Sequence, residues 1–489
     1  MVGNYLVPAV DYLRILPEIV LCIFGIALMM LEAVTSEKQK SALGWLSLAG
    51  IVGAFVANLY AYTSPGFAFQ NMITVDGFGT FFRGLVLVVG FLCVLASLGY
   101  LRREGAESGE YYSLILFSLI GQCILSTAND LIMVFLGLEI SSIATYILAG
   151  FFRGDRRNNE SALKYFLLGS FATAFLLYGI AWIYGATGSI NLDELHRVLG
   201  DPSIAPSTVL IGVAAALMMV GFAFKVSAAP FQVWAPDVYQ GASSPVSAFM
   251  SAGPKAAAFA VFLRVFMTAF GSISSRWIPL IWAIALLSMV IGNFAALLQT
   301  NVKRLLGYSS IAHAGYILVA FTADSQLGVA AVMFYLASYA LMNIGAFFVI
   351  SHVASKRERY VRIEDLAGLS RREPVTAAFL AIFVFSLIGV PLTGGFFAKF
   401  YVFRAALDAH LVWLTVLGLA NSAIAAYYYL KIVVAMYMQE PGEATNQLGP
   451  LASGTRIAIW ASALGVLLLG IFPSVILPFV SRSAMIFSR

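Results

Sequence analysis

The sequence contains few charged residues. Only 11% of its 489 residues are Asp, Glu, Lys or Arg, whereas 61% are hydrophobic. A soluble globular domain carries roughly 25% charged residues, so the composition excludes such a domain and predicts a protein that crosses a membrane many times. The 29 basic residues outnumber the 24 acidic ones, but no basic run with interleaved aromatic residues occurs. We interpret the excess as a membrane-topology signal and expect no nucleic-acid binding.

Cysteine is also scarce. Cys22, Cys93 and Cys123 lie far apart, each inside an apolar segment. No CxxC pair and no cysteine spacing typical of a zinc or iron–sulfur site occurs, so we interpret the three as small buried hydrophobic side chains. We expect neither a redox centre nor a metal site in this chain.

Long apolar runs, in contrast, are abundant. A helix needs about 20 apolar residues to cross roughly 30 Å of hydrocarbon. By this measure the sequence predicts an all-α polytopic membrane protein with 14 transmembrane helices, the lipid bilayer being its first partner. We expect these spans near residues 13–34, 41–63, 78–101, 110–127, 130–152, 161–186, 207–234, 242–270, 277–299, 302–322, 327–353, 374–406, 411–438 and 456–480.

Three of the predicted spans are too long and contain helix-breaking residues. As straight helices, residues 207–234, 242–270 and 374–406 would measure about 42, 43 and 50 Å, and tilt absorbs only part of such an excess. The breaking residues are Pro230 in the first, Gly253 and Pro254 in the second, and Pro391, Gly394 and Gly395 in the third. We predict broken helices at all three places, which are tolerated at membrane depth only inside protein or beside a wet cavity.

The broken spans seven and twelve indicate an internal repeat. They are five spans apart, and each has a break beside a lysine. Because an odd offset reverses the orientation in the membrane, we predict two inverted five-helix repeats, spans 4–8 and 9–13. The expected division is spans 1–3 in residues 1–105, the first repeat in 106–272, the second in 273–440, and span 14 in 441–489.

Basic residues gather in the loops after the first, third, fifth and eleventh spans. They are Lys38, Lys40, Arg102, Arg103, Arg153, Arg156, Arg157, Lys356, Arg357, Arg359, Arg362, Arg371 and Arg372. The even-numbered loops hold few basic residues. Since cytoplasmic loops are enriched in Lys and Arg, we predict that the odd-numbered loops are cytoplasmic and that both termini are periplasmic.

Five ionisable residues inside predicted spans are candidates for a buried functional site. Glu139 and Lys225 lie in apolar surroundings, Lys255 and Lys399 follow helix-breaking residues, and His313 lies near the centre of span ten. A lysine or an acid at bilayer depth costs at least about 2.5 to 3.5 kcal/mol. The alternative for each is a long side chain that reaches the membrane surface. Together they predict a shared, hydrated interior, and we expect water held at the last break to solvate Lys399.

Lys164 and Lys303 each lie one turn into a span on the predicted cytoplasmic side. They could form the inner mouth of a pathway or anchor their helices at the membrane surface.

Other charges lie near span ends. We expect Glu18, Asp76 and Asp130 to cap helix N-termini or to anchor the spans at the membrane interface. We expect Arg83 and Arg264 to reach the membrane surface or to contact a neighbouring subunit.

The pairing of a buried carboxylate with a buried lysine suggests a pump element. At about 4 Å and an effective dielectric near 20, the two attract each other by about 4 kcal/mol. Moving a proton against roughly 180 mV requires about the same energy. Movement of Glu139 relative to Lys225 could therefore make the lysine bind and release a proton, provided that their helices are neighbours. Na⁺ is a less suitable cargo, because one carboxylate among lysines offers few oxygen ligands for a hard cation.

Five stretches resemble the antiporter-like membrane subunits of proton-pumping NADH:quinone oxidoreductase, respiratory complex I. They are "FLGLEISSIATYILAGF", "ESALKYFLLGSFATAFLLYG", "FKVSAAPFQVWAPDVYQGASSPVSAF", "NVKRLLGYSSIAHAGYIL" and "GVPLTGGFFAKFYVF". The resemblance covers nearly the whole chain. It implies inverted five-helix bundles, a bacterial inner-membrane location, and proton translocation driven by quinone reduction elsewhere. NADH, FMN, iron–sulfur clusters and quinone would be bound by other subunits, and the partners would include the antiporter-like subunit M and the small K-, J- and A-type subunits.

The resemblance also implies roles for individual residues. Glu139 and Lys225 match the family's modulating pair, Lys255 its relay lysine, and Lys399 the residue that exchanges protons with the outside.

Further matches lie along the family's central polar axis. His313 and Lys303 match polar members of that axis. Gln232 stands where many relatives have His, so a water-mediated link between Lys225 and Lys255 is needed there.

Three details make the sequence most similar to the subunit N type. The chain ends at Arg489 without the long lateral helix of the family's largest type, Lys399 stands where the middle type commonly has Glu, and "ALKYFLLG" resembles subunit N. Two alternatives remain open. A subunit of a multi-subunit cation/proton antiporter shares this ancestry, and a solute permease shares broken helices and inverted repeats.

Overall fold

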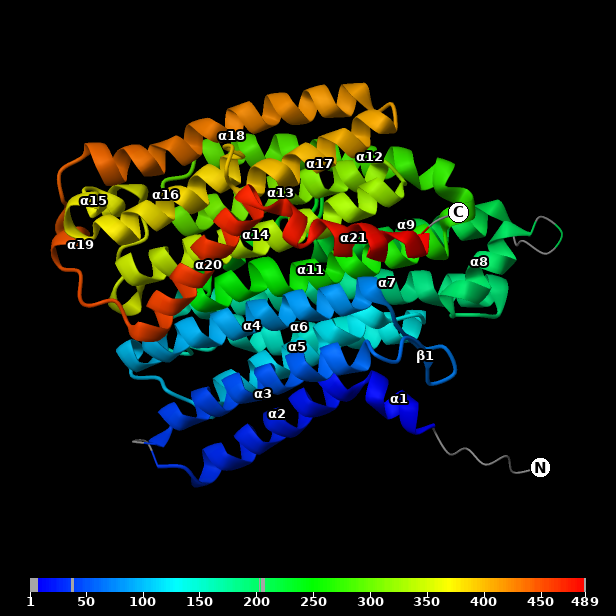
Figure 1. The fold of residues 1–489 in the computed structure, drawn as a ribbon, viewed down its shortest axis with the longest axis horizontal. Helices are drawn as coiled ribbons and strands as arrows, with labels where there is room; N and C mark the ends of the chain where they lie inside the picture. Colours follow the sequence, from blue (N-terminus) through cyan, green and yellow to red (C-terminus); the bar gives the residue numbers. More distant parts are fainter. Residues whose placement is uncertain (1–7, 37–38, 202, 204–206, 488–489) are drawn as a thin grey trace.

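The computed structural model describes residues 8–36, 39–201, 203 and 207–487. Lys38, one of the predicted cytoplasmic charges, lies outside the described residues, as do both chain ends. The described chain is a bundle of long helices, running side by side in alternating directions, with one short β-hairpin of β1 (Gly66–Ala68) and β2 (Ile73–Val75) (Figure 1). The predicted all-α class is therefore confirmed apart from this hairpin.

Twelve helices of the described chain are long and apolar enough to cross a membrane. They are α2 (Leu16–Val34), α3 (Ser41–Ala61), α4 (Gly77–Glu104), α6 (Leu131–Ala149), α7 (Arg156–Thr187), α9 (Thr208–Lys225), α11 (Ser244–Thr268), α12 (Ser274–Leu297, extended at its start by η2, Gly271–Ile273), α13 (Val302–Thr322), α14 (Gln326–Val353), α18 (Val412–Met438) and α20 (Ser453–Ile471).

The remaining helices are shorter or more polar. α5 (Gly109–Thr127) has the length of a span but is slightly less apolar than the twelve helices named above. The shorter α-helices are α1 (Ala9–Arg14), α8 (Leu192–Gly200), α10 (Trp234–Gly241), α15 (Leu369–Arg372), α16 (Pro374–Ile388), α17 (Gly394–Asp408), α19 (Glu443–Asn446) and α21 (Leu477–Ser483). The 3₁₀ turns η3 (Lys356–Glu358), η4 (Ile363–Leu366), η5 (Pro473–Val475) and η6 (Ala484–Phe487) complete the chain.

Two of the three predicted helix breaks are present. α9 ends at Lys225 and α10 begins at Trp234, with Pro230 between them, and α16 ends at Ile388 and α17 begins at Gly394. The break predicted at Gly253 and Pro254 is absent, because α11 continues through Pro254 without interruption. A proline removes one backbone hydrogen bond and can kink a helix without ending it. α11 is buried along nearly its whole length, so packing from every side keeps it helical.

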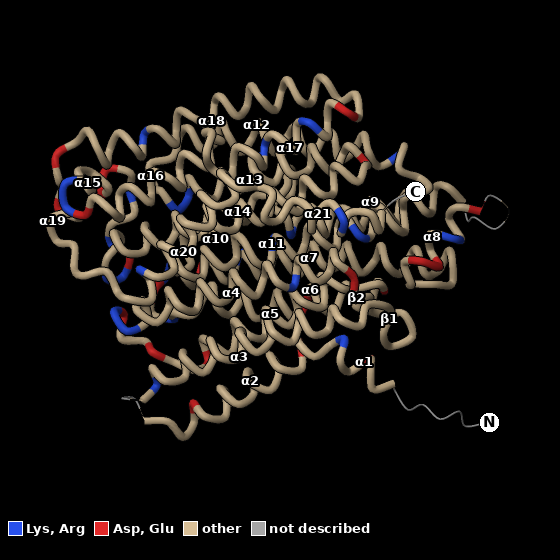
Figure 2. Tube along the Cα trace, viewed as in Figure 1, with Lys and Arg blue, Asp and Glu red and all other residues tan. Residues whose placement is uncertain are grey.

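The two ends of the bundle differ in charge. α1, α8, α21 and the hairpin lie toward one end, and η3, α15 and α19 lie at the other (Figure 1). Lys and Arg gather at the end that holds α15 and α19 (Figure 2). This end carries the basic loops that the sequence places in the cytoplasm.

The centre of the bundle is formed by α11, α13 and α14. Nearly every residue of these three helices is buried, whereas outer helices expose large apolar side chains such as Met30, Phe171 and Trp413. Such exposed apolar faces suit contact with lipid or with other membrane chains. Polar groups on the central helices are therefore shielded from both.

Four of the charges near span ends form two ion pairs. Arg83 lies 2.7 Å from Glu18, and Arg264 holds Asp76 with two hydrogen bonds of 2.8 and 3.0 Å. Both arginines are buried, so the expectation that they reach a surface was wrong, as was the capping role of Glu18. The side chains of Asp76 and Asp130 do cap α4 and α6 as expected. A guanidinium at membrane depth is tolerated here because a carboxylate neutralises it.

Candidate functional site

Lys225 is the last residue of α9 and points into the bundle. Its ammonium donates to the Ser142 hydroxyl at 2.7 Å and to the Tyr165 hydroxyl at 3.4 Å. The rings of Tyr146 and Tyr165 lie 5.7 and 5.4 Å from the nitrogen, within the range of a cation–π contact. The break after α9 thus leaves Lys225 in a pocket of hydroxyl groups and aromatic rings.

The break after α9 is stabilised by Trp234, the first residue of α10. Its indole nitrogen donates to the Phe224 carbonyl at 3.0 Å, and its ring stacks on Tyr165 at 4.5 Å between centroids. A carbonyl near the end of α9 is therefore bound even though the helix stops. The same contacts fix the aromatic wall beside Lys225.

Glu139 lies on the same helix as Ser142, one turn away. The Lys225 ammonium is hydrogen-bonded to Ser142 and not to Glu139. Among the described residues, the buried Oε1 of Glu139 has no hydrogen-bond partner. The hydrogen bond from Lys225 to Ser142 links α9 to α6, but the Glu139 carboxylate and the Lys225 ammonium are not joined in this structure.

Lys255 projects from α11 toward α13. It is only 1% exposed, and its ammonium donates to both the carbonyl oxygen, at 2.9 Å, and the hydroxyl of Ser310. The ring of Tyr339 lies 5.8 Å away. The predicted relay lysine is thus held by oxygen atoms at the centre of the bundle.

His313 lies three residues after Ser310 on α13. Its Nδ1 is 2.7 Å from the Tyr335 hydroxyl, and its Nε2 is 3.2 Å from the Tyr429 hydroxyl. The Tyr429 hydroxyl also bonds the hydroxyl of Ser309. Both ring nitrogens therefore belong to a buried hydrogen-bond network that joins α13, α14 and α18.

Lys399 lies in the second turn of α17, just after the break. Its ammonium donates to the last carbonyls of α16, Leu387 at 3.1 Å and Ile388 at 2.7 Å, and to the Ser422 hydroxyl at 2.7 Å. The Tyr316 ring lies 5.0 Å away. We expected water in the break to solvate this cation, but the carbonyls freed by the break bind it directly. The negative end of α16 thus favours the ammonium.

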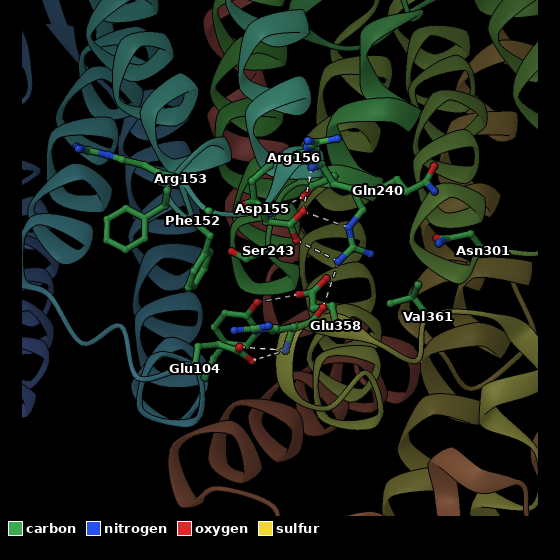
Figure 3. Close-up of a pocket in the computed structure, with 17 residues that line it drawn as sticks. Glu104, Phe152, Arg153, Asp155, Arg156, Gln240, Ser243, Asn301, Glu358 and Val361 are labelled. Atoms are coloured by element: carbon green, nitrogen blue, oxygen red, sulfur yellow. Dashed lines mark hydrogen bonds and ion pairs between the residues drawn. The ribbon is translucent and has the colours of Figure 1, made fainter.

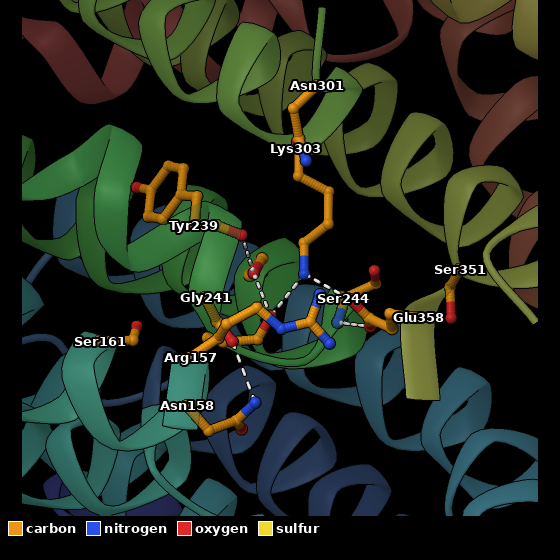
Figure 4. Close-up of polar contacts among 12 residues, drawn as sticks. Arg157, Asn158, Ser161, Tyr239, Gly241, Ser244, Asn301, Lys303, Ser351 and Glu358 are labelled. Carbon is orange, nitrogen blue, oxygen red and sulfur yellow. Dashed lines mark hydrogen bonds and ion pairs between the residues drawn. The ribbon is translucent and has the colours of Figure 1, made fainter. Parts of the chain in front are cut away.

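Lys303 is fully buried near the start of α13, at the basic end of the bundle. Its ammonium donates to Glu358 Oε2 and to the Ala242 carbonyl, each at 2.5 Å (Figure 4). Glu358 lies in η3, outside the long helices. Burial alone would raise the pKa of Glu358, but the charge of Lys303 and hydrogen bonds from Lys303 and Ser244 outweigh it, so the pKa is lowered.

Lys164 is more exposed than the other lysines of the predicted site. It forms ion pairs with Glu160 at 2.6 Å and with Asp237 at 2.7 Å, and Asp237 also pairs with Arg304. α7, α10 and α13 are thereby joined at the basic end. Lys164 therefore lies beside the interior row of lysines, toward the surface.

The polar residues of α13 connect the separate contacts into one zone. Lys255 is bound to Ser310, His313 lies one turn further, and Tyr316 covers Lys399. On the segment that follows Lys225, the buried polar atoms Ser227 Oγ, Gln232 Oε1 and Tyr239 Oη have no hydrogen-bond partner among the described residues. Buried polar atoms of this kind are the usual partners of internal water.

Several residues of this zone were not predicted from the sequence. They are Ser142, Tyr165, Ser310, Tyr335, Tyr339, Glu358, Ser422 and Tyr429. Tyrosine and serine inside apolar spans also serve as ordinary packing residues. Only Glu358, an acid within a run of bases, carried a signal that could have been noticed. Among the described residues, no group of three or more His, Cys, Asp or Glu side chains could hold a metal ion.

The fold and the site define an ion-translocating membrane protein, with a row of ionisable groups buried across a bundle of spanning helices. The chain belongs to the family described as NADH:quinone oxidoreductase/Mrp antiporter, whose sequence model matches residues 128–425. NADH-quinone oxidoreductase subunit N 1 of Solibacter usitatus is 60% identical, with 97% of each chain covered. Subunit N of Trichlorobacter lovleyi is 44% identical, with 96% of each covered.

Solved structures have the same fold. A chain of respiratory complex I from Thermus thermophilus with bound aureothin is 36% identical, with a TM-score of 0.81 over 94% of this chain and 98% of that one. A chain of the Mrp complex from Dietzia sp. has a TM-score of 0.84 over 97% of each chain, but only 20% identity. The second likeness concerns the fold alone.

Proposed function

We propose that this chain is a proton-translocating membrane subunit of NADH:quinone oxidoreductase, of the subunit N type. The observation that carries the proposal is the row of buried ammonium and imidazole groups of Lys225, Lys255, His313 and Lys399, which hydroxyl and carbonyl oxygens hold in one polar zone. The high identity to curated subunit N chains over nearly the full length supports the same conclusion.

The chemistry of the partners suits proton transfer. Hydroxyl and carbonyl oxygens accept hydrogen bonds from an ammonium but do not neutralise its charge. A buried ammonium without a counter-charge is costly, so its protonated form is easily lost when the surroundings change. Approach of Glu139 to Lys225 would stabilise the ammonium by about 4 kcal/mol at 4 Å, and its withdrawal would push the proton onward.

The proposed route runs along the bundle. Glu139 and Lys225 act as the modulating pair, Lys255 as the relay, and His313 as a member of the axis. Lys399 exchanges the proton with the outside. Lys303 and Lys164 serve the cytoplasmic end of the route, and water beside Gln232 bridges the first two lysines.

The proposed membrane arrangement has 14 crossings in two inverted repeats. Adding α5 and the broken pair α16–α17 to the twelve apolar helices gives this number. The first repeat is α5 to α11 and the second is α12 to α18. Tyr146 and Tyr316, from the second helix of each repeat, lie over Lys225 and Lys399 respectively, which supports this internal correspondence.

The basic end of the bundle is assigned to the cytoplasm of a bacterium and both termini to the periplasm. The gathering of Lys and Arg at the end with α15 and α19 supports this orientation (Figure 2). In the assembled complex the neighbours would include subunit M and the small K-, J- and A-type subunits. NADH, FMN, iron–sulfur clusters and quinone would be held by other subunits, and this chain would carry no redox centre.

Two substitutions in the assembled complex test the proposal. Lys225→Ala and Glu139→Gln are expected to leave NADH oxidation by artificial acceptors unchanged, because that reaction needs no proton movement through this chain. Coupled quinone reduction and proton pumping are expected to fall strongly. Lys431→Ala, on the outer helix α18 with its ammonium over the Tyr427 ring, is the matched control. Normal pumping by both Lys225→Ala and Glu139→Gln would refute the assignment.

Purification distinguishes the alternative, a subunit of a multi-subunit cation/proton antiporter. The proposed function requires flavin and iron–sulfur subunits to purify with this chain. The alternative requires only small membrane subunits and Na⁺-dependent proton exchange in vesicles.

A further inference from the structure

A cavity of about 830 Å³ opens at the basic end of the bundle (Figure 3). It is bounded by the end of α4, the segment between α6 and α7, the segment between α10 and α11, and η3. Seven charged residues line it: Glu104, Arg153, Asp155, Arg156, Arg157, Arg357 and Glu358. With four bases and three acids, the cavity is nearly balanced in charge and suited to hold water.

Within the cavity lining, the acids Asp155 and Glu104 accept hydrogen bonds from other lining residues. Arg157 donates to the Asp155 carboxylate at 3.0 Å, and the Arg357 backbone N–H donates to the Glu104 carboxylate at 3.0 Å. Glu358 also lines the cavity, but its ion pair is with a residue outside the lining. That residue is Lys303.

Glu358 therefore links the cavity to the buried lysine. Its Oε2 accepts from Lys303 at 2.5 Å, while its Oε1 accepts from the Ser244 backbone N–H at 2.5 Å and from the Tyr100 hydroxyl at 3.1 Å (Figure 4). Ser244 is the first residue of α11, so the positive end of that helix also favours the carboxylate. α4, α11 and α13 each supply one of these partners.

The backbone around Glu358 is held in an unfavourable conformation. Ser355, Arg357 and Glu358 have φ angles of 58°, 57° and 47°, in the left-handed region that side chains other than glycine seldom adopt. Such a residue persists only where surrounding contacts fix it, often at functional sites. The bonds to Glu104, Tyr100 and Lys303 provide those contacts.

We propose that this cavity is the cytoplasmic proton intake of the subunit, and that Glu358 takes protons from cavity water and passes them to Lys303. This inference rests on the proposed function. When Lys303 gives its proton inward, its amine becomes neutral and the Glu358 carboxylate loses its counter-charge. An uncompensated buried carboxylate binds a proton more tightly.

Each step of this proton transfer conserves atoms and charge. The Glu358 carboxylate takes a proton from a hydronium ion, which leaves water in the cavity. The carboxylic acid then gives this proton to the Lys303 amine, which restores the carboxylate and the ammonium. One proton has moved from the cavity to Lys303, and no electron and no other atom has been transferred.

α13 carries both Lys303 and Ser310, the hydrogen-bond partner of the relay lysine Lys255. Ser310, the partner of Lys255, lies seven residues after Lys303 on this helix, or roughly 10 Å along its axis. A short chain of water molecules can span that distance, so the intake joins the row of lysines at Lys255.

Substitution of both partners separates proton transfer from a structural role. Glu358→Gln is expected to lower NADH-driven pumping by about tenfold or more, a modest effect for loss of a positioned proton carrier, and Glu358→Asp is expected to retain a large part of it. Lys303→Gln combined with Glu358→Gln removes both charges but keeps a hydrogen-bonding pair. The double variant is expected to assemble and still to pump poorly. Glu364→Gln, an exposed acid on the same loop, is the matched control.

Two results would overturn the intake. Normal pumping by Glu358→Gln would show that the carboxylate carries no proton. Recovery of pumping in the double variant would show that the pair is only structural. Lys225→Ala measured in parallel separates the two proposals: if it fails to pump while Glu358→Gln pumps normally, the intake is wrong and the proposed function stands.

Labelling of introduced cysteines tests the cavity even if the Glu358 variants fail to assemble. Gly154 lines the cavity, and Gly200 ends α8 at the other end of the bundle; neither has an atom near an added Cβ. Gly154→Cys is expected to react with an impermeant thiol reagent from the cytoplasmic face and Gly200→Cys from the periplasmic face, above the background of the unmodified chain. Reaction of Gly154→Cys from the periplasmic face would overturn the intake.

Discussion

Replacement of Lys399 by arginine tests whether this residue must release its proton. Arginine keeps the positive charge and the hydrogen-bond donors, but its guanidinium stays protonated in proteins. The three hydrogen bonds of the Lys399 ammonium end on Leu387, Ile388 and Ser422. Because hydrogen bonds to charged groups contribute about 1.5 to 3 kcal/mol each, Lys399→Arg can retain much of this stabilisation while it blocks deprotonation.

Lys399→Met gives the complementary loss. It removes the charge and leaves the Leu387 carbonyl without its donor, while the Ile388 carbonyl keeps the Ser422 hydroxyl at 3.5 Å. An unsatisfied buried carbonyl costs about 1 to 3 kcal/mol. Removal of a buried cation offsets part of this cost. We expect Lys399→Met to loosen the contact between α16 and α17, and Lys399→Arg to leave it intact.

The assay compares pumping with assembly. Inverted membrane vesicles are energised with NADH, internal acidification is followed with a pH-sensitive dye, and NADH oxidation by an artificial acceptor reports the amount of assembled complex. Lys399→Arg is expected to show normal oxidation but pumping reduced by about tenfold or more, as for loss of a proton-transferring group. Normal pumping by Lys399→Arg would refute the reasoning, because a permanently charged residue cannot exchange protons.

Two further substitutions follow from the buried polar contacts. Arg83→Met leaves Glu18 buried without its partner and is expected to destabilise the protein by about 3 to 5 kcal/mol, measured as a lower melting temperature of the purified complex. Combining it with Glu18→Gln should recover most of the loss, and no recovery would contradict the pairing. Tyr429→Phe removes a buried hydroxyl from the histidine network at a cost of about 1 to 3 kcal/mol and should slow pumping without loss of assembly. Tyr427→Phe, on the exposed side of the same helix, should pump normally, and equal effects of the two would argue against a special role for the network.

Hydropathy and the positions of proline and glycine predicted much of the fold. Two breaks lie where Pro230 and Pro391 predicted them, because the chain there gains other partners for its freed backbone groups. Pro254 did not break α11, because that helix is enclosed by neighbours along its length. A sequence shows where a hydrogen bond is missing, but only tertiary packing decides whether the helix continues.

The ionisable residues of the site could be predicted from the sequence, but their hydrogen-bond partners could not. A lysine inside an apolar span is costly and therefore conspicuous, which singled out Lys225, Lys255 and Lys399. Their partners are serines, tyrosines and helix-end carbonyls, which have no distinctive pattern in one sequence. Glu358 was missed because it lies in a loop rich in bases, where an acid looks solvated. Its burial depends on how η3 folds over the starts of α11 and α13.

The central claim is that protons cross this chain through its buried lysines. Lys255 tests it most directly, because it lies between the modulating pair and the proposed exit. Its ammonium is held by Ser310 and the Tyr339 ring. The measurement is the number of protons translocated per NADH oxidised by the purified complex carrying Lys255→Met, reconstituted in liposomes with quinone. We predict that proton translocation through this subunit is lost, so that either turnover with quinone falls steeply or fewer protons move per NADH. An unchanged turnover together with an unchanged number of protons per NADH would contradict the claim.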